Sequence, residues 1–426
     1  MTPHLPSRGQ HPVLLAQALA ALVACGAARA DEPNPWYIGA TQRFSYESNL
    51  YRLGSSPSGP QQTLPAGTSK SDLISTTALV GGLDQAFGRQ RAYGSINAGQ
   101  SVYRDNSKLN TPTYALNLAL DWSTIERFSG KLSFGADQSQ ARYDTVNTGG
   151  EVETRKNVSN SRNLEAVGRM GVVTKLNVEA KLGYSEIRYS AADYQRNNYQ
   201  QQVASLGLNY RPSGLLTMGS ALRQTRSEYP NGLLVGGQPG VYRFTRNDLD
   251  LTATWQPSQV SSMSGRISST RTHYEQDSLL DYTAPTGHLA WDWQPTGKLK
   301  IRTELRRDFG QNGSVIVGTG VVDYSRTTTT LHLNADQEIS AKIAITAAID
   351  QAHRTLTNSY LVTQGTLATQ SGSDSTLTFT LSARWTPTRN TQVGCKLSSE
   401  QRRTDSTLST RLSAASMGCF GQITLQ

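Results

Sequence analysis

Large apolar side chains occupy every second position in many short segments of this chain. In residues 114–122 they alternate with small or polar residues, and the same pattern returns in residues 176–184, 299–305, 343–349 and 377–385. A β-strand with one apolar and one polar face produces this alternation. Its repetition, at about ten residues per segment, is typical of a transmembrane β-barrel whose outer face contacts lipid and whose inner face contacts water.

The alternation predicts eighteen antiparallel strands, an even number that returns both ends of the chain to the periplasm. We place them near residues 36–47, 72–86, 90–104, 113–123, 130–143, 158–171, 175–189, 199–211, 215–229, 243–255, 261–274, 279–293, 298–309, 322–337, 341–355, 374–385, 390–402 and 410–424. Odd-numbered strands are followed by long polar loops, expected at residues 54–70, 144–157, 230–242 and 356–373. Even-numbered strands are followed by tight turns. Barrels of bacterial outer membranes have short periplasmic turns and long external loops in this order.

Four of the expected turns repeat a short motif. An aromatic residue, one spacer, proline and a hydroxyl residue begin at Tyr210, Trp255, Trp293 and Trp385. Proline ends the strand ladder, and the aromatic residue falls where the strand leaves lipid. We therefore expect a periplasmic aromatic girdle made of Trp122, Tyr210, Trp255, Trp293 and Trp385. The alternative of a soluble β-helix or pair of sandwiches has no need for such a girdle.

Composition excludes helical membrane spans. Hydrophobic residues are 36% of the chain and the mean hydropathy is −0.46, while the only long apolar run is residues 13–24. That run fits a secretory signal peptide over residues 1–30, with Arg8 before it and a cleavage site at Ala28 and Ala30. A lipoprotein box ending at Cys25 overlaps it and is the alternative. Residues 31–426 then form a single barrel in the bacterial outer membrane.

The mature chain is basic. Loss of Arg8 and Arg29 with the signal peptide lowers the formal charge from +9 to +7. The remaining lysines and arginines are scattered along the strands and form no helical face or cluster. Together with export, this argues against nucleic acid as a partner and leaves outer-membrane lipid as the first one.

Cys395 and Cys419 are the two cysteines of the mature chain, and both fall in the last expected hairpin. Their midpoint is residue 407, which is close to the middle of the polar segment 403–409 between the two strands. The two cysteines would thus face each other, and the oxidising periplasm favours a disulfide between them. Two free thiols are the alternative.

Candidate chemistry is sparse. The mature chain contains four histidines, and none stands at a metal-ligand spacing from another ligand. The nucleophile motif Gly-x-Ser-x-Gly is absent. We therefore predict no enzyme, no metal site and no cofactor.

Strict alternation from the apolar stripe places many charged residues on the inner face. Three symmetric pairs around turns, Asp121–Lys131, Asp292–Lys300 and Asp336–Lys342, are expected to be ion pairs at the periplasmic rim. Rows of basic side chains in a pore attract anions. The basic residues above that rim, which we expect to line the path of a solute, are Lys181, Arg223, Arg266, Arg302, Arg306 and Lys396. The alternative is that they are paired or solvated without a preferred substrate.

The first hundred residues of the mature chain carry a more specific signal. The first strand ends in residues 47–53, Glu-Ser-Asn-Leu-Tyr-Arg-Leu; Ser71-Asp72 follows the first external loop, and Gly88-Arg89-Gln90-Arg91 marks a tight turn. This order resembles the EpsL-type family of β-barrel proteins encoded in proteobacterial exopolysaccharide operons. Ser48 stands where members usually have a second acid.

The resemblance implies a role in the biosynthesis or export of extracellular polysaccharide. With the basic inner wall, we expect a passive conduit for that polymer, which the wall would suit if it is acidic, fed by periplasmic export or synthesis machinery. The resemblance brings no catalytic residues. Two other functions stay open. A general or anion-selective diffusion porin would be a trimer that narrows its pore with an inward-folded loop, for which residues 54–70 or 356–373 are candidates. A structural or adhesion barrel would have a closed lumen.

Overall fold

The computed structural model describes most of the chain after residue 33. The described residues are 34–54, 63–143, 152, 154–173, 175–235, 238–275, 281–311, 315–317, 320–362, 366–406 and 408–425. The expected signal peptide, with both of its cleavage alternatives, lies outside them. No helix in the described residues is long and apolar enough to cross a membrane.

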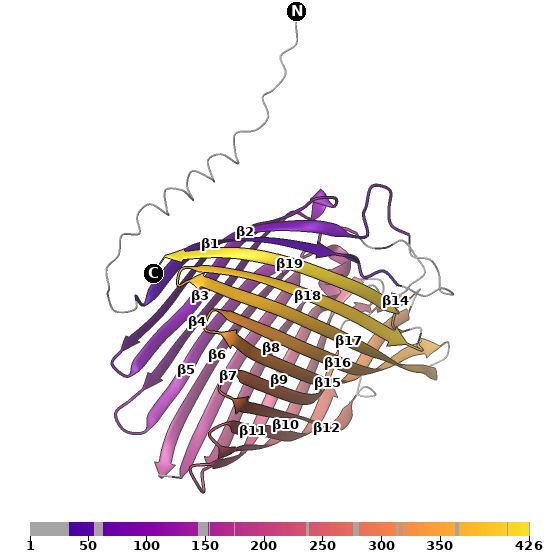
Figure 1. The fold of residues 1–426 in the computed structure, drawn as a ribbon. Coiled ribbons are helices and arrows are strands. Elements are labelled where there is room, and N and C mark those ends of the chain that lie inside the picture. Colours follow the sequence, from indigo (N-terminus) through magenta and orange to yellow (C-terminus); the bar gives the residue numbers. More distant parts are fainter. Residues whose placement is uncertain are drawn as a thin grey trace, which may run out of the picture.

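Eighteen antiparallel strands form one closed wall (Figure 1). They are β1 Trp36–Glu47, β2 Asp72–Phe87, β3 Gln90–Tyr103, β4 Thr111–Ser123, β5 Phe128–Gln140, β6 Val158–Val173, β7 Leu176–Tyr189, β8 Tyr199–Tyr210, β9 Leu216–Val235, β10 Gln238–Ser258, β11 Ser261–Tyr274, β12 Tyr282–Thr296, β13 Leu299–Gln311, β15 Gly320–Ser340, β16 Ile343–Val362, β17 Thr366–Thr388, β18 Thr391–Thr404 and β19 Leu412–Leu425. The short β14 Val315–Val317 pairs only with β15 and stands outside the wall. Two 3₁₀ turns, η1 Ser107–Leu109 and η2 Ala192–Asn197, lie in external connections.

Closure comes from pairing between the first and last strands. Ile38 of β1 lies opposite Leu425 of β19, and Glu47 lies opposite Ser416. A closed wall has no edge, so each backbone N–H and C=O group in lipid finds a partner in a neighbouring strand. The C-terminus therefore lies beside the start of β1, at the end of the barrel that carries the two-residue turns (Figure 1).

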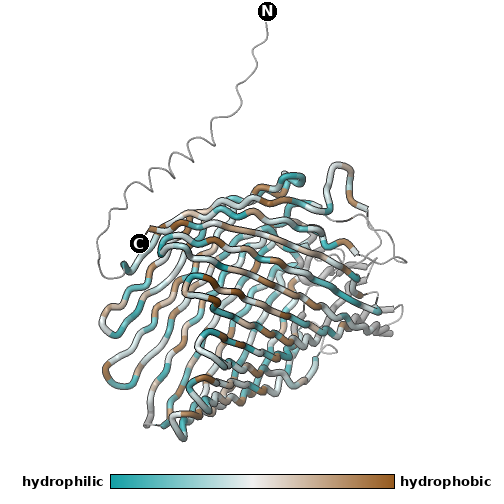
Figure 2. Tube along the Cα trace, viewed as in Figure 1, coloured by the Kyte–Doolittle hydropathy of each residue, from teal (hydrophilic) through white to brown (hydrophobic). Residues whose placement is uncertain are grey.

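The outer face carries the apolar stripe seen in the sequence. Leu79, Leu182, Leu222 and Ile267 are each more than 60% exposed, which only a lipid environment makes favourable. Along the strands, hydrophobic and hydrophilic positions alternate (Figure 2). A closed antiparallel barrel with an apolar outer belt is the architecture of the bacterial outer membrane.

Two expected external loops are instead strand. Residues 230–242 and 356–373 were expected to be polar loops, but β9 continues to Val235, β10 begins at Gln238, β16 continues to Val362 and β17 begins at Thr366. Val362 still pairs with Thr366 in an unbroken ladder. Taken together, glycine, proline, asparagine, serine and threonine are frequent in both segments and mark loops in a sequence, and they interrupt the regular alternation of apolar and polar residues that would have shown these extensions. The candidate pore-narrowing loop at residues 356–373 is therefore wrong.

The tight turn expected after the second strand is present. Gly88 has a φ of 61°, which a residue with a side chain adopts with difficulty, and Gln90 starts β3 directly afterwards. The neighbouring Arg89 donates from Nη1 to the carbonyl of Thr124 at 2.9 Å, which ties this turn to the next one along the periplasmic rim.

Candidate functional site: the inner wall and the external cap

The two faces of the wall differ sharply between β9 and β12. On β10, Leu249 and Leu251 are 49% and 57% exposed, while Asp248 and Asp250, which alternate with them, are only 3% and 5% exposed. On β11, Ile267 is exposed and Ser268 is buried. The polar side chains of this region thus point inward and pack against one another, because nothing but neighbouring side chains can bury them inside a barrel.

Arg246 on β10 organises this polar layer. Its Nε donates to Asp248 Oδ1 at 3.0 Å, and its Nη1 donates to Asp308 Oδ1 on β13, also at 3.0 Å. Its Nη2 reaches the hydroxyls of Thr270 on β11 and Thr286 on β12 at 3.4 and 3.3 Å. One guanidinium therefore links four neighbouring strands, which requires a strongly concave inner face. Alternation alone puts Arg246 inside, but only the strand register shows which acids it contacts.

A second buried ion pair joins β16 to β17. Arg354 lies directly opposite Asp374 in the ladder. Its Nε donates to Asp374 Oδ1 at 2.6 Å and its Nη2 donates to Oδ2, so the pair is bidentate. The Asp374 side chain is fully buried and also accepts from Ser409 Oγ at 2.5 Å. The carboxylate thus depends on this arginine for its charge compensation.

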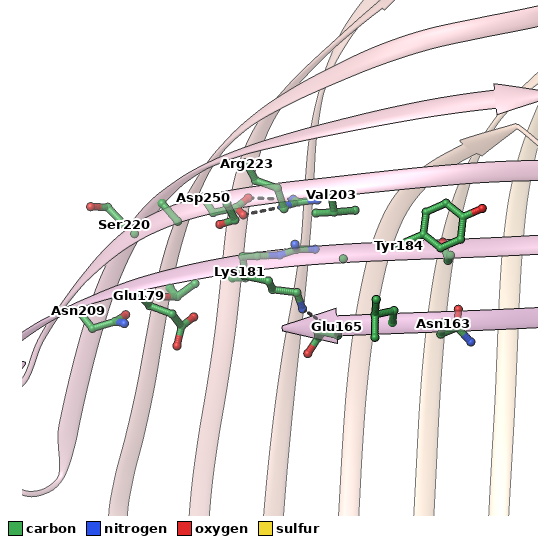
Figure 3. A pocket seen from close by; sticks show the side chains of 18 residues that line it. Asn163, Glu165, Glu179, Lys181, Tyr184, Val203, Asn209, Ser220, Arg223 and Asp250 are labelled. Carbon is green, nitrogen blue, oxygen red and sulfur yellow. Dashed lines mark hydrogen bonds and ion pairs between the residues drawn. The ribbon is translucent and has the colours of Figure 1, made fainter. Parts of the chain in front are cut away.

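Polar side chains of β6 to β11 surround a cavity of about 560 Å³, which we call the β6–β11 cavity (Figure 3). In Figure 3, Lys181 points toward Glu165 and Arg223 toward Asp250. Lys181 Nζ lies 2.5 Å from Glu165 Oε2, and Arg223 Nε lies 2.9 Å from Asp250 Oδ2. A second cavity of about 650 Å³ lies in the periplasmic half, lined by residues such as Tyr37, Asp84, Tyr93, Asn117 and Asn163.

The structure divides the six basic residues predicted to line the lumen into two groups. Lys181, Arg223, Arg302 and Arg306 each lie within 4 Å of a carboxylate. Arg266 and Lys396 have no such ion pair among the described residues. Arg266 lines the β6–β11 cavity together with Lys181 and Arg223, whereas Lys396 lies apart on β18, between Ser382 and Gly418.

The ion pairs predicted at the periplasmic rim follow a different register. Asp121 does lie opposite Lys131, but the Lys131 ammonium stands 5.5 Å above the ring of Tyr93. Asp292 lies opposite Arg302, not Lys300, and its Oδ1 accepts a hydrogen bond from Arg302 Nη1 at 2.9 Å. Irregular pairing next to the turns, between Trp293 and Thr296 and between Glu338 and Ser340, shifts the register there.

Asp336 shows the same shift. It lies opposite Lys300 and Thr346 rather than Lys342, and Lys342 Nζ instead donates to the carbonyl of Pro387 at 2.8 Å. The pairs Asp292–Lys300 and Asp336–Lys342 are therefore wrong. Turn symmetry predicts cross-strand partners only where the turn contains no bulge.

The segment that carries the family resemblance folds inward. Asn49 is 1% exposed: its Nδ2 donates to the carbonyls of Leu53 and Ser413, both at 3.0 Å, and its Oδ1 accepts from Leu53 N at 2.8 Å. Arg52 has a φ of 55°, a left-handed conformation that is strained for a residue with a side chain. These bonds hold the chain after β1 in a compact loop. The loop ends at Gly54, which forms a single β-bridge with Leu412 at the start of β19.

Three external loops meet on this segment and form a small core that we call the external cap. Its buried members are Tyr51, Leu53, Tyr103, Leu109, Tyr143 and Val152. Tyr51 is fully buried, with its ring 4.8 Å from that of Tyr143 and its hydroxyl bonded to Asn106 Oδ1 at 3.0 Å. Burial, with the charge of Asp72 nearby, raises the pKa of the Tyr51 phenol to about 12, so this external residue stays protonated and can donate.

Asp72 connects the cap to β2. Its Oδ1 accepts from the backbone N–H groups of Arg104 and Asp105 at 2.9 and 3.1 Å, and its Oδ2 accepts from Asn106 N at 2.8 Å. The resemblance segments at residues 47–53 and 71–72 are thus the parts that build the cap. Sequence reasoning quoted these residues and did not assign them a structural role.

The cap reaches across the barrel mouth. Arg142, just after β5, donates from Nη2 to Glu400 Oε1 on β18, although these strands are six positions apart around the wall. Arg52 Nη2 lies 3.8 Å from the other oxygen of the same carboxylate. Loops that touch over that distance must fold over part of the opening. Sequence reasoning missed Arg142 and Glu400 and gave Arg52 no partner, because contacts between external loops leave no periodic signal.

The five girdle residues lie at the periplasmic ends of their strands. Tyr210, Trp255, Trp293 and Trp385 are between 38% and 50% exposed, and Trp122 is half-buried near the end of β4. Trp293 stacks on Trp291, with ring centroids 5.4 Å apart. Aromatic rings at this level match the interface between lipid tails and headgroups.

Cys395 and Cys419 form a disulfide between β18 and β19. The two residues are direct partners in the ladder, and their Cα atoms are 4.0 Å apart. Each cysteine is two residues from an exposed apolar side chain on the same strand, Leu397 at 47% and Met417 at 54%. Residues two apart share a face of the strand, so the disulfide lies on the lipid-facing side. It closes the last hairpin next to the seam where β19 meets β1.

Replacing both cysteines by serine is expected to lower the free energy of unfolding by about 3 kcal/mol, because the bond closes a loop across a separation of 24 residues. Urea unfolding in detergent micelles, followed by circular dichroism, measures the change. Reduction of the unaltered barrel with dithiothreitol is the matched control and should reproduce it. Equal midpoints for the oxidised, reduced and serine forms would contradict a stabilising role.

No group of three or more His, Cys, Asp or Glu side chains among the described residues is arranged to hold a metal ion.

No protein-family model matches this sequence, and no curated protein is recognisably similar to it. Solved structures of similar shape are outer-membrane proteins. OccK2 (OpdF) of Pseudomonas aeruginosa has a TM-score of 0.47 at 11% identity, over 92% of this chain and 98% of that chain. OccK1 (OpdK) of the same species has a TM-score of 0.47 at 8% identity, over 92% and 99%.

The siderophore receptor PirA of Acinetobacter baumannii has a TM-score of 0.42 at 5% identity, over 93% of this chain and 81% of that chain. At these scores and identities the similarities do not identify a substrate for the chain.

Proposed function

We propose that this protein is a passive diffusion channel of the outer membrane for small polar solutes. The observation that carries the proposal is the pair of cavities, of about 560 and 650 Å³, that polar side chains line on the inner wall. Barrels of 16 to 18 strands are wide enough to hold an aqueous channel. Lining residues such as Asn117, Asn209 and Ser205 bond water and solutes equally well, which suits passage rather than retention.

The paired arginines support a channel that discriminates weakly by charge. Arg302 and Arg306 are about half exposed, but each shares its charge with an acid, Asp292 or Asp308. A wall of ion pairs presents local fields of both signs and little net potential. Anion preference then depends on the basic residues that have no acidic partner.

Export of an acidic polysaccharide, with its periplasmic machinery, is a narrower form of the same activity and stays a prediction from the sequence resemblance. It requires a path for a polymer past the external cap. The third possibility, a closed structural barrel, predicts no permeation at all.

Single-channel recording of the refolded mature protein in a planar bilayer tests the proposal. We expect steady open current in potassium chloride, with weak anion preference. Acidic and neutral oligosaccharides are then added on either side in turn. Block by acidic oligomers alone would favour the polysaccharide conduit, indifference to both would favour a general porin, and absence of current in a folded barrel would overturn the channel.

Charge reversal of Arg302 and Arg306 to glutamate, R302E/R306E, asks whether the wall sets selectivity. The double variant removes two positive charges and adds two negative ones beside Asp292 and Asp308, a net change of four charge units, so we expect the channel to become cation-selective. The reversal potential in a potassium chloride gradient measures this. An unchanged reversal potential would remove these two residues from the solute path.

A further inference from the structure

One of the basic side chains that line the β6–β11 cavity has no acidic partner. Three acidic residues, Glu165, Glu179 and Asp250, face three basic residues, Lys181, Arg223 and Arg266. Each acid already has a cation: Lys181 bonds Glu165 at 2.5 Å, Arg169 bonds Glu179 at 2.7 Å, and Arg223 bonds Asp250 at 2.9 Å. Arg169 does not line the cavity, so Arg266 is the lining cation left without an acid of its own within the described residues.

No acid forms an ion pair with Arg266 among the described residues, and Asp250 and Asp308 act on its charge only from beyond ion-pair distance. In the ladder it lies between Thr252 on β10 and His288 on β12, and His288 in turn lies opposite Arg306. The Nε of Arg266 is buried and has no hydrogen-bond partner in the part of the chain that the structure describes. A buried donor without an acceptor is unfavourable, so rotation of the guanidinium toward an anionic oxygen in the cavity would gain both a hydrogen bond and charge compensation.

The acid nearest to this arginine is already committed. Both oxygens of Asp250 accept from Arg223, and Oδ1 also accepts from Ser268 Oγ at 2.5 Å. Asp248 is shared between Arg223 and Arg246. A movement of Arg266 toward either carboxylate would compete with the contacts that these carboxylates already make with Arg223 and Arg246. An acceptor atom from a ligand is therefore a better partner for the guanidinium of Arg266.

The rest of the lining is suited to hydroxyl groups. Seven of its eighteen lining residues carry a side-chain amide or hydroxyl, among them Asn163, Ser185, Ser205, Asn209 and Thr252. Its volume of about 560 Å³ falls within the range of about 300–1,000 Å³ that small-molecule sites occupy. A ligand with one negative charge matches the single unpaired guanidinium, whereas a dianion would also meet the repulsion of the three lining carboxylates.

We propose that the β6–β11 cavity is a binding subsite for a small polyhydroxylated monocarboxylate, of the chemical class of a uronic acid, with Arg266 as the residue that binds the carboxylate. The planar guanidinium is suited to a carboxylate, and the surrounding amides and hydroxyls bond the sugar hydroxyls. The subsite rests on the proposed function, because the solute reaches the cavity only through an open lumen.

Calorimetric titration of the refolded barrel in detergent with galacturonate tests the subsite, with galactose as the uncharged probe. We expect Arg266→Gln to bind galacturonate about tenfold more weakly than the unaltered barrel, as loss of a hydrogen bond to a charged group predicts. Arg266→Lys keeps the positive charge and loses the planar guanidinium. Its galacturonate affinity should lie between that of the unaltered barrel and that of Arg266→Gln. Galactose affinity should be the same in all three.

Lys396→Gln is the matched control, because Lys396 is also an inner-face cation without an ion pair in the described residues, but it lies outside the cavity. It should leave galacturonate affinity within about twofold. Equal losses in Lys396→Gln and Arg266→Gln would overturn the subsite in favour of a general field of the wall. Unchanged affinity in Arg266→Gln and Arg266→Lys, or no binding by the unaltered barrel, would overturn it too.

Conductance of the same preparations separates this proposal from the channel. A barrel that conducts ions and does not bind galacturonate overturns the subsite and leaves the diffusion channel in place. A barrel that binds galacturonate through Arg266 and conducts nothing overturns the channel and leaves the subsite. Folding of each variant is checked by its heat-dependent electrophoretic mobility, and Arg266→Lys provides the test if Arg266→Gln does not fold.

Discussion

Replacing Tyr51 with alanine is expected to raise the single-channel conductance about twofold or more, because the size of the opening sets the current. Tyr51 is the fully buried centre of the external cap, in contact with Tyr143 and bonded to Asn106. Without its ring the loops after β1, β3 and β5 lose their common contact. The contact of Arg142 with Glu400, which spans the mouth, then has no packed support.

Tyr51→Phe is the matched control for this experiment. Phenylalanine keeps the ring packing against Tyr143 and removes only the hydroxyl that bonds Asn106. We expect it to keep a conductance close to that of the unaltered barrel. The cap would not restrict the channel if Tyr51→Ala left both mean conductance and current noise unchanged, and a rise in Tyr51→Phe alone would assign the effect to the hydrogen bond.

The second large effect concerns stability. Arg354→Met is expected to lower the free energy of unfolding by about 3–5 kcal/mol, because removal of one partner leaves an uncompensated buried charge. Asp374 is fully buried, and without the arginine its carboxylate would keep the hydrogen bond from the hydroxyl of Ser409. Equilibrium unfolding in urea, followed by circular dichroism in detergent micelles, measures the difference.

Two further variants define the cause. Arg302→Met removes an arginine whose partner Asp292 is 51% exposed, and the expected loss is below about 1 kcal/mol. Arg354→Met combined with Asp374→Leu removes both charges and should recover most of the stability, since a buried pair contributes little beyond an apolar replacement. A double variant as unstable as Arg354→Met would assign the loss to packing instead of charge.

Much of the barrel follows from the sequence for a simple reason. Lipid on one side and water on the other impose a period of two, so residues 114–122 already show which side chains face out. The same period locates all eighteen wall strands and pairs Cys395 with Cys419. Where residue types typical of turns interrupt a strand, as Pro230 and Gly232 do at the end of β9, the period is broken, and strand was mistaken for loop.

The inner-wall chemistry was only partly predictable. Alternation identifies Lys181, Arg223 and Arg266 as facing inward, but it does not show that two of them are already paired. Pairing depends on register and bulges, which place Asp292 beside Arg302 rather than Lys300. A shift of two residues in the strand register is invisible in composition and decides which charge stays available for a ligand.

The sequence by itself determined the class of fold, the membrane it inhabits and the inward or outward direction of most side chains, because each follows from the local contrast between lipid and water. Only the tertiary structure decided that residues 47–53 fold into the mouth and that Arg266 is left without an acidic partner. Those outcomes depend on contacts between residues far apart in the chain, such as Arg142 and Glu400, and no local pattern records such contacts.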